Sequence, residues 1–361
     1  MDRATVTVYE ERAAEWKARR SGGGQHEAAG RFRQAVAPGA MRVDLGCGPG
    51  FHLAALGEPI VAFDAARAML ELAREGAPSA LPVQADIEAP PFRDHSLGGA
   101  WARASYLHVP RVRLPLALAR LHWALERGAP FVLSVRLGDD EGAHLAKSGD
   151  FPGRFFAEWR ADGLADLLIG AGFEVEEIVE DRGHTAEFLV AWTRRARSLP
   201  DTVGADMRML VCGLNPSIYA ADRGVGYARP GNRFWPAAIA AGLVSRDRDP
   251  LDALVSHGIG MTDLVKRATR TASELDRDEY RAGVARLERV VRWLRPRAVC
   301  FVGLAGWRAA IDPRAVAGAQ PDGFAGVPAY VMPSTSGANA HAQLPEATTH
   351  LRAAAELAAS S

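Results

Sequence analysis

The chain has 361 residues, 48% of them apolar, and a formal net charge of zero. This length and composition favour two domains, each with an ordinary core. The N-terminus has no apolar h-region and no apolar run approaches a membrane span, so we expect neither a secretory signal nor a membrane helix. Three widely spaced cysteines, Cys47, Cys212 and Cys300, exclude a disulfide framework and a zinc or iron–sulfur set. We therefore expect a soluble, cytoplasmic protein without a metal site.

The zero net charge hides a difference between the two halves of the chain. Residues 207–361 hold 19 Lys and Arg against 14 Asp and Glu, which gives +5, so residues 1–206 carry −5. A mildly basic C-terminal half fits a polyanionic partner, although a charge of this size is a weak indication by itself.

Strands and helices alternate along the first half of the chain, which predicts a doubly wound, Rossmann-like α/β sheet. Residues 7–37 have helical apolar spacing, interrupted by Ser and Gly at 21–24. Strands are predicted at 41–45, 59–63, 81–85, 97–102, 130–135 and 188–192, and helices at 65–74, 112–126 and 156–170.

A polar segment at 193–206 contains a proline and a glycine and has no periodicity, which is typical of a linker. We expect domains at 1–195 and 207–361, joined by 196–206. The α/β pattern then restarts. Strands are predicted at 209–212, 298–303 and 329–332, and a further strand leads into residues 261–263. Helices are predicted near 236–241, at 278–294 and after Pro345.

A glycine-rich loop, DLGCGPG at 44–50, follows the first strand and precedes a helix. Glycines there let the backbone approach a ligand closely and tolerate positive φ. The next strand ends in Asp64, where a carboxylate can accept both hydroxyls of a ribose. The third strand ends in an acid and an apolar residue, Asp86 and Ile87, which can hold an adenine. The candidate cofactor residues are Gly46, Gly48, Gly50, Asp64, Asp86 and Ile87.

Together these motifs resemble the class I S-adenosylmethionine-dependent methyltransferases, over about residues 5–195. The resemblance implies that the three glycines surround the methionine part of S-adenosylmethionine, that Asp64 binds its ribose and that Asp86 lies near its adenine. The alternative is an eroded Rossmann-like domain that binds nothing.

The methyl acceptor is not determined by the sequence. Residues 102–105, Ala-Arg-Ala-Ser, lack the polar-Pro-Pro-aromatic motif of base amino-methyltransferases. Cys47 lies in the cofactor loop, where it cannot serve as the nucleophile of cytosine C5-methylation. Arg103, Tyr106 and His108 are either acceptor contacts or ordinary packing.

Two strands of the second half each break into a loop of small polar residues, at 209–217 (MLVCGLNPS) and 331–341 (VMPSTSGANAH). Such exits place polar side chains and free N–H groups at the carboxyl edge of a sheet, where open α/β folds bind ligands. The first loop carries Asn215, whose amide can orient a water molecule but cannot take up its proton. Between the loops lies an aromatic and arginine-rich segment, 227–236.

This combination resembles the mismatch-specific uracil- and thymine-DNA glycosylases, over about residues 207–356. The resemblance implies an α/β/α fold, no cofactor, and Asn215 as the catalytic residue that positions the water. Tyr227 stacks on the flipped base, and N–H groups near Leu214 and Tyr227 bind the carbonyl oxygens of that base. Ser217 replaces the usual glycine and either narrows the base pocket or contacts a phosphate.

The second loop matches the DNA-insertion segment of that family. Its hydroxyls and amides are expected to bind phosphates, and its tip to fill the gap left by the flipped base. Ala338 and Asn339 form a small plug, and His341 either supports it or is an ordinary surface residue. The expected DNA-binding loop consists of Ser334, Thr335, Ser336, Gly337, Ala338, Asn339 and His341.

Four more residues of this half have uncertain roles. We interpret Asn232 as a cap of the next helix, and Phe234 and Trp235 as core aromatics rather than substrate contacts. Asp263 is interpreted as an exposed loop carboxylate, the alternative being a second group that orients the water.

The sequence thus predicts a monofunctional DNA glycosylase of base excision repair, fused to a methyltransferase-like domain of unknown acceptor. Its substrate is expected to be uracil, and possibly thymine, opposite guanine in duplex DNA. In the rival interpretation, methyl transfer to a small molecule or nucleic acid is the main activity and the second domain is a DNA-binding module. The oligomeric state is not predicted.

Overall fold

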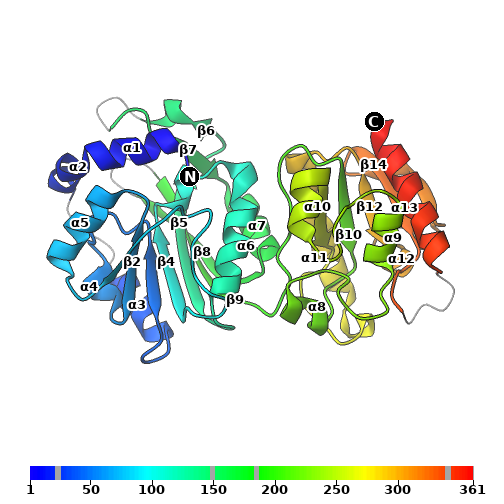
Figure 1. The fold of residues 1–361 in the computed structure, drawn as a ribbon, viewed down its shortest axis with the longest axis horizontal. Coiled ribbons are helices and arrows are strands. Elements are labelled where there is room, and N and C mark those ends of the chain that lie inside the picture. The colour runs from blue at the N-terminus through cyan, green and yellow to red at the C-terminus, as the bar shows by residue number, and fades with distance from the viewer. Residues whose placement is uncertain (21–25, 147–150, 183–186, 338–342, 361) are drawn as a thin grey trace. The chain divides into compact units, whose positions relative to one another are not determined.

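The computed structural model describes residues 1–20, 26–146, 151–182, 187–337 and 343–360. They divide into two compact units. The first comprises Met1–Ile169 and Phe173–Ala196, and the second Gly170–Gly172 and Arg197–Ser361. Each unit has its own sheet, and both are mixed α/β structures, as the sequence predicts (Figure 1).

The sheet of the first unit reverses its strand order between β1 and β4, and such a switch point is where open α/β sheets bind ligands. Neighbours along the path pair in parallel up to β7, and β6, β8 and β9 pair antiparallel. The order is β3 (Leu81–Gln84), β2 (Ile60–Asp64), β1 (Arg42–Leu45), β4 (Gly99–Arg103), β5 (Pro130–Leu137), β7 (Phe156–Trp159) and β6 (Glu141–Gly142); β9 (Glu187–Arg195) pairs with β5, and β8 (Phe173–Arg182) with β9.

The helices of the first unit cover this sheet, and its buried core includes Phe32, Trp101 and Leu53. The chain begins with two helices, α1 and α2, which pack against α5. The α-helices are α1 (Arg3–Glu11), α2 (Ala13–Arg19), α3 (His26–Ala35), α4 (Leu53–Leu56), α5 (Arg67–Gly76), α6 (Leu114–Ala124) and α7 (Ala161–Gly170). Short 3-10 turns lie at Tyr106–His108, Arg111–Arg113 and Ala143–Leu145, and in the second unit at Ala272–Glu274.

One predicted helix of this unit is partly wrong. Residues 156–159, expected to begin the helix at 156–170, form strand β7 instead. They pair in parallel with the end of β5, Arg136 opposite Glu158 and Leu137 opposite Trp159, so tertiary pairing overrides the local helical spacing. The long strand β8 was not predicted, and it is stabilised by its pairing with β9.

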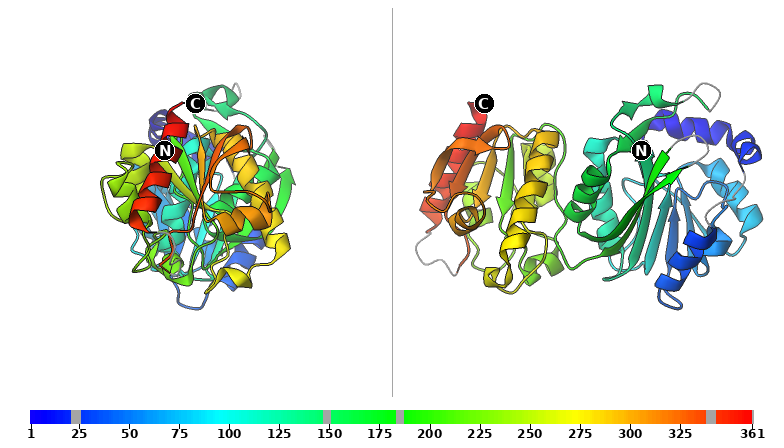
Figure 2. Two further views of the ribbon diagram at one scale, coloured as in Figure 1. Left: turned by 90° about the vertical axis from the view of Figure 1, so that its right-hand side faces the viewer. Right: turned by 180° about the vertical axis from the view of Figure 1, so that it is seen from behind.

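The second unit is a five-stranded sheet between two layers of helices. Its order is β11 (Ile259–Asp263), β10 (Met209–Gly213), β12 (Val299–Val302), β14 (Val327–Met332) and the antiparallel β13 (Gly318–Phe324). Helices α9 (Phe234–Ala240), α10 (Pro250–His257) and α13 (Leu344–Ala359) cover one face, and α11 (Arg277–Leu294) and α12 (Leu304–Ala310) the other (Figures 1 and 2). The short α8 spans Ile218–Arg223.

Residues 197–206, in the segment predicted as a linker, pack on the second unit. The buried carboxylate of Asp201 lies 2.6 Å from Lys266 Nζ and 3.0 Å from Arg286 Nη1. The backbone of Thr202 bonds with that of Met261 in both directions. Burial by itself would raise the pKa of Asp201, but the two cations hold it below its usual value.

Among the residues that the structure describes, no helix is long and apolar enough to cross a membrane. That same part of the chain contains no group of three or more His, Cys, Asp or Glu side chains that could hold a metal ion. All three cysteines are buried thiols.

Candidate active sites

A cavity of about 590 Å³ lies in the first unit at the carboxyl ends of β1, β2 and β4. The glycine loop contributes Gly46 and Gly48 to its wall, β2 contributes Asp64, and the segment after β4 contributes Ser105. The N-terminal helices contribute Tyr9 and other side chains. The cavity therefore coincides with the switch point of the sheet.

The glycine loop needs its glycines for two reasons. Gly46, Gly48 and Gly50 have φ values of 73°, 54° and 85°, in the left-handed region that side chains disfavour. A Cβ atom on Gly46 would also lie 2.4 Å from Ser105 Cβ, and one on Gly50 would lie 3.1 Å from Ala73 Cα. The loop therefore has no room for a larger residue at position 46 or 50.

Asp64 occupies the position expected for a ribose ligand. Its two carboxylate oxygens accept hydrogen bonds from Gly48 N and Ala66 N, each at 2.9 Å, which fixes the side chain beside the glycine loop. Burial raises the pKa of Asp64 to about 6, although the peptide N–H groups oppose this shift.

Asp44 is a site residue that sequence reasoning missed. It ends in the cavity, is 2% exposed, and its Oδ2 has no hydrogen-bond partner in the described part of the chain. Burial, with a smaller contribution from the charge of Asp64, raises the pKa of Asp44 to about 8. A buried acceptor without a partner is rare, so a ligand donor is expected there. The available signal was the acidic residue that opens the glycine loop.

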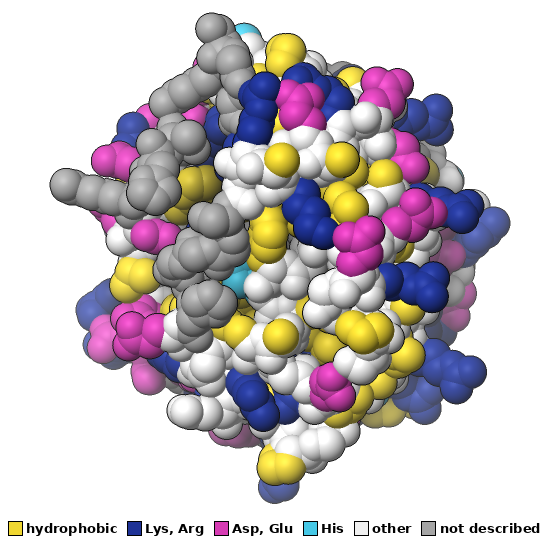
Figure 3. All heavy atoms as spheres, turned by 90° about the vertical axis from the view of Figure 1, so that its left-hand side faces the viewer, with side chains coloured by type: hydrophobic (Ala, Val, Ile, Leu, Met, Phe, Trp, Pro, Cys, Tyr) yellow, Lys and Arg dark blue, Asp and Glu magenta, His cyan; other side chains and the backbone are white. Residues whose placement is uncertain are grey.

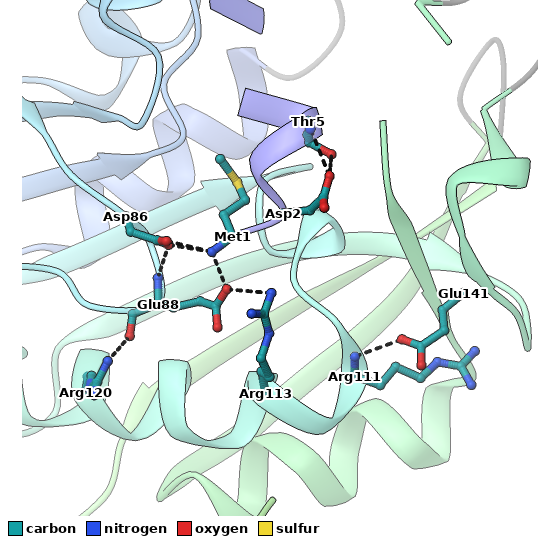
Figure 4. Close-up of polar contacts among 9 residues, drawn as sticks. All are labelled: Met1, Asp2, Thr5, Asp86, Glu88, Arg111, Arg113, Arg120 and Glu141. Atoms are coloured by element: carbon teal, nitrogen blue, oxygen red, sulfur yellow. Dashed lines mark hydrogen bonds and ion pairs between the residues drawn. The ribbon is translucent and has the colours of Figure 1, made fainter. Parts of the chain in front are cut away.

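The structure separates Asp86 from Ile87. Ile87 is buried and lines the cavity, whereas Asp86 is not part of its wall. The carboxylate of Asp86 instead lies 2.7 Å from the Met1 amino group and accepts a hydrogen bond from Glu88 N (Figure 4). Glu88 also contacts the Met1 amino group and, at 3.1 Å, Arg113. A contact of Asp86 with adenine stays a prediction.

A hydrogen-bonded chain in the cavity wall joins Tyr9, His108 and Arg154. Tyr9 Oη lies 2.9 Å from His108 Nε2 and accepts a hydrogen bond from Arg154 Nη1 at 2.9 Å. His108 Nδ1 lies 2.6 Å from the Phe155 carbonyl oxygen. Tyr106 is fully buried, packs against aromatic core residues and is not in the cavity wall. Of the three candidate acceptor contacts, Arg103 and His108 therefore line the cavity.

In the second unit, Asn215 follows β10 and is oriented by three acceptors. Its Nδ2 donates to Thr269 Oγ1 at 2.7 Å, to the Arg267 carbonyl at 3.0 Å and to the Pro216 carbonyl at 3.3 Å. These bonds hold the side chain by its nitrogen and leave its carbonyl oxygen as the group that can accept a hydrogen bond from water.

Tyr227 lies beside the same loop. Its ring stacks on Phe234 with centroids 4.2 Å apart and an angle of 22°, and the residue is partly exposed. The residue has a φ of 58°, unusual for a side chain of this size. Its hydroxyl is buried without a hydrogen-bond partner among the described residues.

Ser217 begins helix α8 as its N-cap, with Oγ accepting from Ala220 N at 3.1 Å. Leu214, before Asn215, is half-buried, and its carbonyl accepts from Val265 N at 2.9 Å. Asn232 Oδ1 accepts from Phe234 N at 2.9 Å, but the N-cap of α9 is Arg233, so Asn232 lies one residue before the cap position. Phe234 and Trp235 are fully buried core residues, as expected.

The interpretation of Asp263 as an exposed loop carboxylate is wrong. It is the last residue of β11 and is 8% exposed, because the edge strand lies beside β10 and the absent side chain of Gly213 leaves room for it. A Cβ atom on Gly213 would lie 2.4 Å from Asp263 Oδ1 and 3.1 Å from Tyr227 Oη. Burial raises the pKa of Asp263 to about 6, opposed by the charge of Lys266.

The second loop is attached to the segment after Tyr227. Arg233 N donates to the Thr335 carbonyl at 2.9 Å, and Arg233 Nη1 donates to the Ser336 carbonyl at 3.2 Å. Ser334 Oγ accepts from Ser336 N, and Gly337 lies against Gly231. Thr335 is 1% exposed, so its hydroxyl is inside the unit rather than on its surface. Ala338, Asn339 and His341 lie outside the described residues.

Comparisons with known proteins identify both units. Residues 200–358 match the family model of the uracil DNA glycosylase superfamily, and residues 43–133 match that of a methyltransferase domain. The chain joins a methyltransferase domain to a uracil DNA glycosylase superfamily domain.

Three solved methyltransferases are similar to this chain. An S-adenosylmethionine-dependent methyltransferase from Methanosarcina mazei is 17% identical, covers 46% of this chain and 97% of its own, and gives a TM-score of 0.41. The 1,6-didemethyltoxoflavin-N1-methyltransferase from Burkholderia thailandensis is 18% identical, with coverages of 54% and 88% and a TM-score of 0.46. An S-adenosylmethionine-dependent methyltransferase from Mesorhizobium loti is 20% identical, with coverages of 48% and 99% and a TM-score of 0.39.

Both resemblances drawn from the sequence are thus confirmed at the level of the family. In the glycosylase domain, the structure brings Asn215, Tyr227 and Asp263 to one edge of the sheet. In the methyltransferase domain, it brings the glycine loop, Asp64 and Ile87 to one cavity and leaves Asp86 outside it.

Proposed function

We propose that the glycosylase domain excises uracil, and more slowly thymine, from G-mismatched duplex DNA by hydrolysis of the N-glycosidic bond. The observation that carries this proposal is the orientation of Asn215, whose amide nitrogen is bound by three protein acceptors. An amide fixed in this way presents its oxygen to a water molecule in one direction. This role is the one that the mismatch-specific branch of the superfamily assigns to its asparagine.

The remaining residues of the site act on the flipped base and the water. The ring of Tyr227, held in place by its stack on Phe234, packs against a base extracted from the helix. Backbone N–H groups near Leu214 and Tyr227 stabilise the negative charge of the departing base. Asp263, buried beside Gly213, is the second group that acts on the water, because a carboxylate with a pKa of about 6 can accept a proton at neutral pH.

For the methyltransferase domain we propose binding of S-adenosylmethionine and transfer of its methyl group, the chemistry that this molecule supplies when bound. The cavity beside Gly46 and Gly48 and the lone Oδ2 of Asp44 fit such a ligand, since they supply space and an acceptor for an ammonium group. Asp64 would accept the ribose hydroxyls, and Ile87 would pack against the adenine.

The test of the glycosylase proposal is base release from a U·G duplex by the full-length protein, detected as strand breakage after alkali. Asn215→Ala should lower the single-turnover rate by about 10²-fold or more, since it removes the group that positions the water. Binding of the duplex should change little, because phosphate contacts carry affinity independently of this amide.

Asp222→Ala serves as the control variant, because its carboxylate is half-exposed and pairs with Arg197 on the surface. Wild-type protein that binds the duplex for hours without producing alkali-labile sites would refute the glycosylase proposal. That outcome would favour the rival interpretation, in which the domain is a DNA-binding module for the methyltransferase.

A further inference from the structure

We propose that the methyl acceptor of this chain is a small molecule with a carboxylate group, methylated on a carboxylate oxygen. The inference rests on the methyl transfer proposed above and names its substrate class. It is carried by the side of the cavity that Arg103, Arg136 and Arg154 line together with aromatic side chains.

Three guanidinium groups line that side of the cavity. Arg136 and Arg154 are buried, at 7% and 3% exposure, and both lie over the ring of Phe156, at 3.6 and 4.9 Å from its centroid. Arg103 joins them from the end of β4. Because an arginine stays charged at any physiological pH, this wall presents fixed positive charge to a bound molecule.

Arg103 is the one of these arginines placed to bind an anion directly. Its guanidinium makes no hydrogen bond or ion pair with any residue that the structure describes, and the nearby charges are those of Asp181, Arg20 and Asp44. Burial lowers the pKa of Arg103, which shows that its charge is only partly compensated. A planar guanidinium binds a carboxylate through two parallel hydrogen bonds.

Among the described residues of the cavity wall, two carboxylates could act as bases, but Asp181 acts on Arg103 through its charge and Asp44 is assigned above to the ammonium group of the cofactor. The remaining candidate, His108, is not suited to remove a proton from an alcohol or amine. His108 Nδ1 lies 2.6 Å from a carbonyl oxygen and so carries the ring proton, which makes Nε2 the acceptor of the Tyr9 hydroxyl. Burial lowers the pKa of His108 to about 3, with Arg154 and Arg136 adding to the shift. Asp64 is held at the cofactor end by Gly48 and Ala66.

An acceptor that arrives already deprotonated needs no such base, and a carboxylic acid, with a pKa near 4, is ionised at neutral pH. In the transfer, the bond between the sulfonium sulfur and the methyl carbon breaks and its electron pair stays on the sulfur. A carboxylate oxygen supplies the pair for the new carbon–oxygen bond. The products are a methyl ester and a neutral thioether, and no proton has to leave.

Size and surface charge argue for a small acceptor rather than a nucleic acid. A volume of about 590 Å³ is within the range of small-molecule sites, and Tyr9 and Trp16 of the N-terminal helices wall the cavity. Residues 1–206 carry a net charge of −5. On the face of this domain that Figure 3 shows, Lys and Arg side chains are interspersed with Asp and Glu, not gathered into a basic patch.

The first experiment measures binding by the full-length protein saturated with S-adenosylhomocysteine, with benzoate and benzamide as matched aromatic probes. Benzoate should bind at least about tenfold more tightly, since only it pairs with a guanidinium. Arg103→Met should remove most of this preference and Arg103→Lys only part of it, with S-adenosylhomocysteine binding unchanged in both. If Arg103→Met does not fold, the wild-type preference and Arg103→Lys decide.

The second experiment incubates the protein with methyl-labelled S-adenosylmethionine and either benzoate or a U·G duplex. Label transferred to benzoate should be released as methanol by alkali, as from an ester. Equal binding of the two probes, binding of benzoate without label transfer, or label on the duplex would each overturn the proposal. Absence of S-adenosylhomocysteine binding would instead remove the proposed cofactor site, and this inference with it.

Discussion

Three buried carboxyl groups at the ends of parallel strands, Asp44, Asp64 and Asp263, have pKa values raised by burial. Asp201 is equally buried but lies between Lys266 and Arg286, and its pKa is lowered. The difference separates two uses of an acid. A paired carboxylate stabilises the fold, whereas one without a cation within hydrogen-bond distance is stabilised by a ligand or by a proton.

Asp64 makes the binding of S-adenosylmethionine dependent on pH. Only the ionised carboxylate can accept both ribose hydroxyls while it accepts the bonds of Gly48 and Ala66. Since its pKa is about 6, affinity should be constant above pH 7 and fall as the pH drops through 6. Calorimetry of the full-length protein between pH 5 and 8 measures this.

In Asp64→Asn the affinity should be about tenfold lower and independent of pH, because one charge-assisted acceptor is lost. Glu71→Gln, an exposed carboxylate on α5, is the matched control and should behave as the wild type. A wild-type affinity that does not change down to pH 5 would show that this carboxylate is not the group that binds the ribose.

Because of Asp263, the rate of base excision should fall at acidic pH. Its carboxylate is protonated below pH 6 and ionised above it, so the single-turnover rate should rise through pH 6 and level off by pH 7.5. Asp263→Asn should remove this fall and lower the plateau, since a general base contributes about 10²–10⁴-fold. The rate on a U·G duplex, measured from pH 5 to 9 in both proteins, tests this.

A wild-type rate that is flat over this range would restrict the water-orienting role to Asn215. The sequence also favours a rate that does not depend on pH, because an asparagine cannot take up a proton and Asp263 is expected on the surface. The burial of Asp263 beside Gly213 is the observation that changes this expectation.

At the level of the elements, the segment before β10 belongs to the glycosylase fold. Ser198 Oγ donates to the Lys266 carbonyl, and the Thr262 hydroxyl donates to Asp201 Oδ1 at 2.7 Å. These contacts join the segment to β11 and the residues that follow it, and the pair of Asp201 with Arg286 joins it to α11. A local lack of periodicity therefore did not indicate a free linker.

Asp201→Ala should destabilise the glycosylase domain by about 3–5 kcal/mol, because it leaves two buried cations without their partner. Urea unfolding of the full-length protein, followed through the transition of this domain, measures the change. Asp222→Ala removes the exposed pair with Arg197 and should cost less than about 1 kcal/mol. Equal effects of the two changes would mean that the buried pairing contributes no more than a surface one.

The sequence predicted the main parallel strands well, because each is a short apolar run followed by a turn. It did not predict strands that depend on their pairing partners. Segment β7 is a strand because β5 pairs with it, and β8 is a strand because β9 pairs with it. It found Asn215 and Asp64 through their motifs. It missed the burial of Asp263 and the lone oxygen of Asp44, which depend on contacts between distant residues.

At the scale of the whole molecule, the two halves of the chain carry opposite net charges. Residues 207–361 carry +5, whereas residues 1–206 carry −5 and place arginines in the wall of a cavity. Under the proposed function, long-range attraction of the duplex is confined to the half that acts on it.

The full-length protein should release uracil faster from U·G than from U·A duplexes, and thymine from T·G more slowly than uracil. Flipping costs least where pairing is already poor, and the extra methyl group of thymine has to fit beside Tyr227 and Ser217. Single-turnover rates on three duplexes of otherwise identical sequence measure this order. Equal rates on U·G and U·A would leave the protein a uracil glycosylase without mismatch preference.

Because Gly213 has no side chain, the residue types that positions 213 and 263 can carry depend on each other in evolution. A methyl group there would overlap the carboxylate of Asp263 and press on the hydroxyl of Tyr227. The φ of Gly213 does not itself require glycine, so the constraint comes from these neighbours alone. Alanine becomes acceptable at 213 only after residue 263 shrinks, and the effects of the two changes cannot add independently. A lineage that loses the acid at 263 can therefore also lose the glycine at 213, whereas a lineage that keeps the acid has to keep the glycine.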